Sequence, residues 1–350
     1  MTNDAPLSPE ITLVILNYNG ARWLDRCLES ICRQTAVRRL EVVITDNGSQ
    51  DESRAICERF APRLPALQFI NNGKNLWYCE ANNIGAAAAR SPLIFILNND
   101  LWLEPDCVER LLQAAAERPD AQLFSPRVLN YDDDTYQGFG SLGIDWLGVC
   151  WSPPDHATPR ELFSGYGCAF VIRKDWFFKI GAYPPELLIY VDELDLGWRS
   201  WAAGGRGLST PAARVHHRGA SVANPSGGIQ HVELRTNEMK RFLSVRNGIL
   251  LLLKNCQHFL LLMLIPHLLM LGCEAIAFLV LTRNWKFVRQ TYVRGVGEAF
   301  AMRSHVRYWR RKNRSLRRHG DFWMLRFVTW RLNRLGEFKQ VFKLGPPKVG

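Results

Sequence analysis

The stretch PLIFILNND at residues 92–100 predicts the centre of the fold. Its first six residues form a short apolar run with β-branched and aromatic members, which is typical of a buried strand. The run ends abruptly in Asn98, Asn99 and Asp100. Small molecules and ions that bind α/β proteins lie in the crevice beyond the carboxyl ends of the strands, so Asp100 is a candidate binding residue. Asn-Asn-Asp is also ordinary turn chemistry, and this stretch alone does not distinguish the two interpretations.

Three earlier stretches repeat the pattern of a buried strand that ends in polar residues. They are ITLVIL at 11–16 followed by NYNG, EVVIT at 41–45 followed by DNGS, and LQFI at 67–70 followed by NNG. Four helices are predicted after these strands. The first has an apolar stripe of Leu24, Cys27, Leu28 and Ile31, the second spans 51–60, and the third is a small-residue helix at 81–89. The fourth has Pro105 in its first turn and an apolar stripe of Val108, Leu111, Leu112 and Ala115. This alternation predicts an α/β fold with a mostly parallel, doubly wound sheet flanked by helices. Four polar strand ends on one edge of a sheet indicate a polar ligand.

Composition limits the class of protein. The 350 residues, 47% of them hydrophobic, suffice for one large domain with an appendage or for two domains. The nine cysteines form no C-x-x-C pair, which predicts reduced thiols in a cytosolic protein, and the acidic, proline-containing N-terminus does not read as a secretory signal. No G-x-G-x-x-G follows the first strand and no Walker lysine motif occurs, which argues against a dinucleotide enzyme or a P-loop ATPase.

The charge is unevenly distributed. Residues 283–350 hold 18 Lys and Arg against three acidic residues, so the rest of the chain is slightly acidic. A basic tail indicates an anionic partner, which could be a membrane, a nucleic acid or a phosphorylated substrate. Residues 255–273 carry no formal charge, and this length just suffices for about 30 Å of hydrocarbon. The arginines that follow are interspersed with Trp285, Trp309, Trp323 and Trp330, and this pattern predicts an interfacial membrane anchor. One alternative is a soluble helical subdomain or dimer interface, and the other is a true membrane span or a re-entrant hairpin.

Taken in order, the motifs resemble those of the family 2 glycosyltransferases of the GT-A fold, most closely the rhamnosyltransferase-like members. The resemblance rests on ITLVILNYNG, EVVITDNGSQD, ILNND, GCAFVIRK at 167–174, IGAYPPELLIYVDELDLGWR at 180–199 and PAARVHHRGAS at 211–221. It implies a GT-A catalytic domain over residues 10–255, with a nucleotide-sugar half at 10–100 and an acceptor half at 101–255. The remaining parts are a tail at 1–9, an apolar helical segment at 256–282 and a basic helical tail at 283–350.

The resemblance also implies the donor and metal residues. Asp100 matches the acid of the metal motif, for Mg²⁺ or Mn²⁺, and His217 matches a histidine near the diphosphate or metal; Asn98 replaces the first acid of that motif. Residues that match donor contacts are Asn17, Asn19, Asp46, Asn75, Asn83 and Asn99. The sequence departs from the family at Trp77, Glu80 and Ala81, where glycines are typical, and side chains there restrict close backbone approach to the donor.

The catalytic base is expected in Asp192-Glu193-Leu194-Asp195. The second acid of the pair matches the family base, so Glu193 is predicted as the base, with Asp192 as the alternative. Asp195, Trp198 and Arg199 are expected to support this region or the acceptor, since acids favour helix N-termini. His216 is expected to be an ordinary structural residue, and Asp132–Asp134 a solvated loop.

The predicted activity is metal-dependent, inverting transfer of a single sugar from a nucleotide-sugar, with dTDP-rhamnose as the first donor hypothesis. The acceptor would be a glycan or a lipid-linked glycan at the cytoplasmic face of the cell membrane, for cell-wall polysaccharide synthesis. The Gln-x-x-Arg-Trp motif of processive members is absent. The alternatives are an inactive family member that acts as a scaffold and a nucleic-acid-binding protein that uses the basic tail; a homodimer could form through the C-terminal helices.

Overall fold

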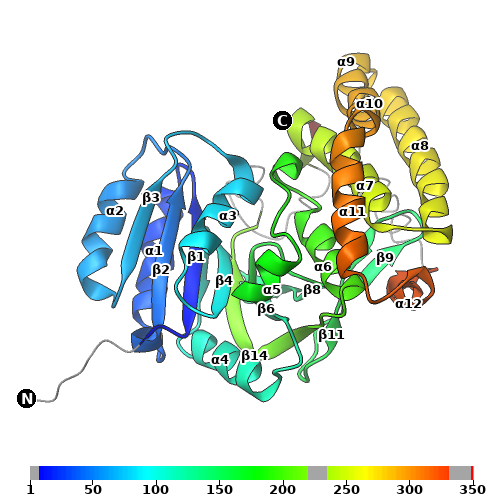
Figure 1. The fold of residues 1–350 in the computed structure, drawn as a ribbon. Helices are drawn as coiled ribbons and strands as arrows, with labels where there is room; N and C mark the ends of the chain where they lie inside the picture. Colours follow the sequence, from blue (N-terminus) through cyan, green and yellow to red (C-terminus); the bar gives the residue numbers. More distant parts are fainter. Residues whose placement is uncertain (1–7, 220–234, 331–347, 350) are drawn as a thin grey trace, which may run out of the picture.

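A mixed sheet runs through the centre of the molecule (Figure 1). The computed structural model describes residues 8–219, 235–330 and 348–349. The strand order is β11-β14-β6-β13-β4-β1-β2-β3, with β5 paired to β14 and β7 to β6. The strands are β1 (Ile11–Asn17), β2 (Leu40–Asp46), β3 (Leu67–Asn71), β4 (Leu93–Asn98), β5 (Leu101–Leu103), β6 (Leu123–Asn130), β7 (Tyr136–Gly138), β11 (Glu161–Leu162), β13 (Ala169–Arg173) and β14 (Gly207–His217).

The predicted α/β class and the mostly parallel sheet are confirmed. Strands β3, β2, β1 and β4 are parallel neighbours, and β14 is parallel to β6, whereas β13 lies antiparallel between β4 and β6. The carboxyl ends of β1, β2 and β4 therefore meet at one edge, which is where the polar residues of the sequence motifs lie.

Alternate residues of the central strands pack on opposite faces of the sheet, which explains why the strands read as continuous apolar runs. One face packs on α1 (Ala21–Cys32), α2 (Ser53–Phe60) and α4 (Cys107–Glu117), and the predicted stripes of α1 and α4 are buried there. The other face packs on α3 (Trp77–Ala88), α5 (Lys174–Lys179) and α7 (Glu238–Asn255). Gly85 of α3 permits this contact, because a Cβ there would lie 2.4 Å from Cγ1 of Val14.

Several predicted boundaries were wrong. The third helix begins at Trp77 rather than at residue 81, and Pro105 precedes the first residue of α4, Cys107, by two positions. His216 and His217 are the last two residues of β14. Tertiary hydrogen bonds extend β14 beyond the apolar pattern, since it pairs with β6 through His217.

The C-terminal part is a group of helices packed on the sheet domain (Figure 1). It packs against α6 (Asp192–Ala202), which precedes β14 in the chain, and comprises α7, the 3₁₀ helix Phe259–Met263, α8 (Leu264–Thr282), α9 (Trp285–Val288), a π-helical turn (Arg289–Val293), α10 (Arg294–Ala301), α11 (Arg303–Leu316) and α12 (Asp321–Met324). The apolar stretch 255–273 is therefore no continuous helix: α7 ends at Asn255, and Pro266 lies in the first turn of α8, where its missing N–H is tolerated. Of the expected tails, residues 1–7, 331–347 and 350 lie outside the described residues.

Trp309 was expected to be one of the interfacial tryptophans, and the structure contradicts this. Its ring is buried, with Arg199 and Lys254 stacked over it at 4.9 Å from the ring centroid. Trp285 and Trp330 are exposed, as an interfacial role requires. The basic tail is thus folded onto the rest of the molecule as far as residue 330, because α11 packs against α6 and α7.

Candidate active site

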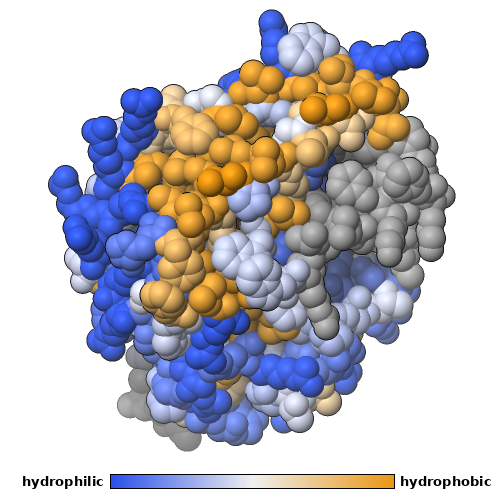
Figure 2. Space-filling model, turned by 90° about the vertical axis from the view of Figure 1, so that its right-hand side faces the viewer, coloured by the Kyte–Doolittle hydropathy of each residue, from blue (hydrophilic) through white to orange (hydrophobic). Residues whose placement is uncertain are grey.

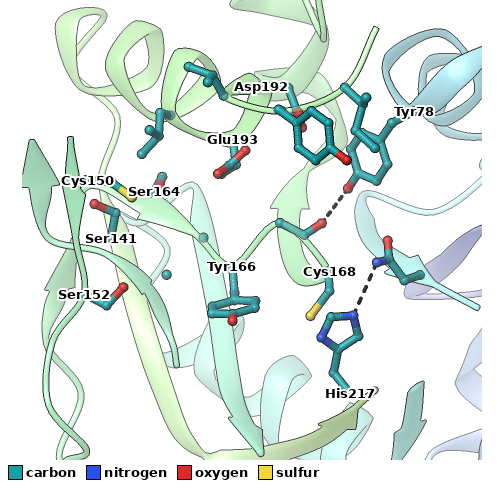
Figure 3. A pocket seen from close by; sticks show the side chains of 18 residues that line it. Tyr78, Ser141, Cys150, Ser152, Ser164, Tyr166, Cys168, Asp192, Glu193 and His217 are labelled. Atoms are coloured by element: carbon teal, nitrogen blue, oxygen red, sulfur yellow. Dashed lines mark hydrogen bonds between the residues drawn. The ribbon is translucent and has the colours of Figure 1, made fainter. Parts of the chain in front are cut away.

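A cavity of about 460 Å³ opens between the sheet edge and the start of α6 (Figure 3). One end is formed by Asn98 and His217 at the ends of β4 and β14. Short strands and loops form the other wall and supply hydroxyl and backbone groups; they are β8 (Gly140–Ser141), β10 (Cys150–Trp151) and β12 (Ser164–Gly165), with Ser152 and Tyr166. A cavity with polar side chains around its walls can hold a polyhydroxylated ligand.

The two predicted acids lie at the first turn of α6. Asp192 is buried, whereas Glu193 is half-buried and projects into the cavity between Ser164 and Tyr166 (Figure 3). Burial raises the pKa of Glu193. Burial and the neighbouring charge of Glu193 raise the pKa of Asp192 well above its ordinary value. A carboxylate that is more basic than usual and faces a cavity has the properties of a general base.

The predicted metal residues are brought together. Nε2 of His217 lies 3.3 Å from Oδ1 of Asp100, and Nδ1 of the same ring lies 2.8 Å from Oε1 of Gln137. The amide of Asn98 lies 3.5 Å from Nε2 (Figure 3). Burial alone would lower the pKa of His217, but the charges of Cys168 and Asp100 raise it well above its ordinary value.

Four of the predicted donor residues meet at the ends of β1, β2 and β4. Asn17 donates to Asp46 (2.8 Å) and accepts from Asn99 (2.6 Å). Asp46 also accepts from the hydroxyl and the backbone N–H of Ser49, and that hydroxyl accepts from the N–H of Asn19. Gly20 makes room for this network, because a Cβ there would lie 1.8 Å from the amide of Asn99.

Asn75 and Asn83 lie in α3 or just before it and are separate from that network. Asn75 accepts from the N–H of Trp77 and from Asn47. Asn83 donates to the carbonyl of Tyr183 (2.8 Å) and accepts from its N–H (3.0 Å), which favours a structural role over donor contact. Trp77 has a φ of +62°, a conformation that favours glycine. This conformation explains why a glycine would suit the position at which the sequence has Trp77.

Asp195, Trp198 and Arg199 are buried beneath the acid pair, with Trp198 packed edge-on against Phe163. Asp195 pairs with Arg199 and with Lys254 of α7, each at 2.9 Å. Burial alone would raise the pKa of Asp195, but the two cations hold it well below its ordinary value. This geometry favours the supporting role over acceptor contact.

His216 is buried, stacked on Trp102 and paired with Glu104 and Asp134. The expected solvated loop 132–134 is thus tied to the body at its third residue. The structure also shows cavity residues that the motifs did not indicate. The hydroxyl of Tyr78 donates to the carbonyl of Gly167 (2.6 Å), and the thiol of Cys168 points toward His217 (Figure 3). Cys168 lies within the motif GCAFVIRK, but the motif gives no sign that the thiol faces a cavity, and only the fold brings Tyr78 and Cys168 to it.

Comparisons with known proteins agree with this geometry. Residues 12–181 match the profile described as Glycosyl transferase family 2. The chain is 26% identical over 241 residues to the N-acetylglucosaminyl-diphospho-decaprenol L-rhamnosyltransferase of Mycobacterium tuberculosis. The aligned region covers 61% of this chain and 77% of that protein.

Two solved structures share the fold. TarS residues 1–349 of S. aureus, in complex with UDP-GlcNAc, superposes with a TM-score of 0.58 at 11% identity over 96% of this chain and 92% of that chain. GalNAc-T7 with UDP, GalNAc and Mn²⁺ superposes with a TM-score of 0.52 at 21% identity over 61% of this chain and 44% of that chain. Over residues 12–181 the chain therefore matches glycosyl transferase family 2, it shares the GT-A fold with these structures, and a rhamnosyltransferase is among its relatives.

Proposed function

We propose that this chain transfers one sugar from a nucleotide-sugar donor to an acceptor hydroxyl, with inversion at the anomeric carbon. The observation that carries the proposal is that Glu193 lines the same cavity as Asn98 and His217. Burial also raises the pKa of Glu193. The carboxylate of Glu193 would take the proton of the acceptor hydroxyl as it attacks the donor. Apart from Glu193, only the carboxyl of Asp192 lines the described cavity, and it is buried behind the start of α6, so a covalent intermediate with retention is disfavoured.

The donor would lie over the strand ends. Asp46, held in one orientation by Asn17 and Ser49, would contact the nucleoside, and Asn99 would extend the same polar surface. The name of the mycobacterial relative supports rhamnose as the sugar, and dTDP-rhamnose is the donor that we propose first. Mutually bonded amides and a carboxylate are preorganised before the donor binds, which lowers the entropy lost on binding.

A divalent cation fits beside the donor. Asp100 and His217 supply one carboxylate oxygen and one imidazole nitrogen 3.3 Å apart, and the described residues contain no group of three or more acidic, histidine or cysteine ligands that could hold a metal. A site with two protein ligands suits Mg²⁺ or Mn²⁺ completed by the diphosphate of the donor, as the Mn²⁺ in GalNAc-T7 also suggests. When bound, the cation would neutralise charge that develops on the leaving diphosphate. Gln137 would keep the His217 ring oriented through Nδ1.

The direct test is a thermal-shift screen of the protein with UDP-, dTDP- and GDP-sugars, each with and without Mg²⁺ or Mn²⁺. A ligand that binds only the folded state raises the melting temperature by mass action, so one nucleotide class is expected to raise it in a metal-dependent way. Asp100→Ala is expected to abolish the metal-dependent part of the shift. The absence of any shift with a well-folded protein would instead favour an inactive scaffold.

The acceptor is proposed to be lipid-linked, and the protein peripheral on the cytoplasmic face of the membrane. The segment Phe259–Thr282 is long and apolar enough to cross a membrane, and only 22% of its most apolar window is buried. Figure 2 shows an apolar area across the upper part of this side of the molecule. The hairpin of β9 (Gly143–Asp145) and β10 joins this helix to the cavity, because Nδ1 of His267 in α8 contacts the carbonyl of Leu147 at 2.5 Å and Cys150 lines the cavity.

The exposed face of α8 supports an interfacial position. Leu269, Ile276 and Val280 are 66%, 65% and 70% exposed, although they belong to a folded helix. Arg283 and Lys286 are exposed beside Trp285, where the helix ends. An apolar face bordered by cations and a tryptophan matches an anionic bilayer surface.

Vesicle sedimentation tests this surface. The double variant Leu269→Glu/Val280→Glu is expected to lose most of its co-sedimentation with vesicles of anionic phospholipid, since two charges would enter the apolar layer. Phe178→Glu, which changes an exposed aromatic residue on α5, should bind like the unchanged protein. If the double variant converts a dimer into a monomer while vesicle binding is weak throughout, the face is covered by a second copy instead.

A further inference from the structure

The backbone directly before the acid pair is held in an unusual conformation. Leu188, Tyr190 and Val191 have φ values of +65°, +71° and +66°, within four consecutive residues. Side chains disfavour this region of φ, and the β-branched Val191 does so most strongly. The segment reaches the cavity at residues 189–191 and is followed at once by Asp192 and Glu193. Strained backbone persists only where the surrounding structure holds it, so the contacts of this segment decide where Glu193 points.

Three of those contacts come from one side chain of α7, and the carbonyl of Leu188 also accepts from the N–H of Cys79 in α3 (2.9 Å). The amide nitrogen of Asn247, which is fully buried, donates to the carbonyls of Leu187 (2.9 Å), Ile189 (3.0 Å) and Tyr190 (2.9 Å). Its oxygen accepts from Nε of Arg246 (3.0 Å). Arg246 is also buried and donates to the carbonyl of Glu186. All of the hydrogen-bonding groups of the Asn247 amide are therefore used on this segment or on its neighbour.

The same helix also holds the other side of the acid pair. Lys254 and Asn255, seven and eight residues after Asn247, both contact Oδ1 of Asp195, at 2.9 and 2.8 Å. Residues seven apart lie on one face of a helix. One face of α7 thus forms hydrogen bonds with the residues before Asp192 and an ion pair and a hydrogen bond with Asp195, which follows Glu193. This helix lies beyond residue 181, where the match to the family profile ends.

We infer that Asn247 is a positioning residue for glycosyl transfer: its amide holds residues 187–190 in the backbone conformation that aims Glu193 into the cavity. The inference rests on the proposed function for the role of Glu193. Asn247 contacts the cavity-lining residues Ile189 and Tyr190 through their carbonyls but does not itself line the cavity, so it would act on turnover and leave donor binding unchanged. A misplacement of about 1 Å at a reacting group can lower a rate by about 10²-fold.

The test compares Asn247→Leu with a matched control, Gln34→Leu. Gln34 is equally a buried amide side chain, and it lies just after the end of α1. It donates to the carbonyl of Glu104 and accepts from the N–H of Val108, away from the acid pair. Asn247→Leu is expected to lower kcat about 10- to 100-fold, with the KM for the donor unchanged within about threefold. Amide hydrogen exchange at residues 188–191 should be faster in this variant. Gln34→Leu should lower the melting temperature with kcat close to that of the unchanged protein.

Three results would overturn the inference: an unchanged kcat in Asn247→Leu, an equal loss of kcat in Gln34→Leu at the same melting temperature, or unchanged exchange at 188–191. Asn247→Ser brings in no larger side chain and retains one donor, so it serves if the leucine variant does not fold; it should show a smaller loss in the same direction. The exchange measurement needs no substrate. If no sugar transfer is detected with any donor, the proposed function fails while exchange still decides whether Asn247 holds the segment.

Discussion

Glu193→Gln is expected to lower kcat by about 10²- to 10⁴-fold while donor affinity is retained. Glutamine keeps the shape of the side chain but cannot accept the proton of the acceptor hydroxyl at neutral pH. The side chain projects into the cavity and is separate from the strand-end network around Asp46, so donor binding should not depend on its charge. Single-turnover transfer and a thermal shift with the donor measure the two quantities.

Asp192→Asn is the matched control, because the two acids are adjacent and only Glu193 is half-exposed to the cavity. It should lower kcat much less than Glu193→Gln. The reverse order of effects would assign the base to Asp192. Neither variant is expected to unfold the protein: burial raises the pKa of both carboxyls, so each is less stable when ionised, and an uncharged amide relieves that penalty.

The pH dependence follows from the same shift. A base must be ionised to accept a proton, and burial raises the pKa of Glu193 above its ordinary value of 4.5. The rate should therefore fall on the acidic side at a pH above that value, and this limb should vanish in Glu193→Gln. The sign for stability is opposite: a carboxyl that binds its proton more tightly in the folded state reduces folding stability as pH rises through and beyond its ordinary pKa.

Asp195→Asn is expected to lower the free energy of unfolding by about 3–5 kcal/mol. Its carboxylate is 1% exposed and neutralises two side chains that are equally buried, Arg199 and Lys254. Asparagine would leave both cations without a counter-charge in the interior, and their desolvation is then uncompensated. Urea denaturation at pH 7 measures the change. Because the pKa of Asp195 lies below its ordinary value, this stabilisation is present above that value and is lost as pH falls below it.

Arg54→Ala provides the comparison for an exposed ion pair. Arg54 and Glu58 are 69% and 66% exposed, and such pairs contribute only about 0.2–1 kcal/mol. Equal destabilisation by Asp195→Asn and Arg54→Ala would show that the buried cluster is not what joins α6 to α7. A large loss for Asp195→Asn alone would identify this cluster as the main attachment of the helix that carries the acid pair.

The sheet domain was predictable because its signals are local. The apolar runs at 11–16, 41–45 and 92–97 are strands, and the stripes of α1 and α4 face the core as their spacing predicted. Parallel strands bring their carboxyl ends to one edge, so Asn17, Asp46 and Asn99 were expected to meet, and they do. The pairing of Asp100 with His217 was implied only by the family resemblance, since the two lie 117 positions apart.

The sequence by itself determined the fold class, the family and most residues at the strand ends, since hydrophobic period and polar strand ends are written in consecutive residues. Only the tertiary structure showed which acid faces the cavity and that Trp309 is buried. It also showed that Asn247 and Lys254 of α7 contact the chain on the two sides of the acid pair. These features depend on contacts between residues about 60 positions apart. Side-chain burial and hydrogen bonding across such distances arise from how helices pack on the sheet, and no local pattern encodes that packing.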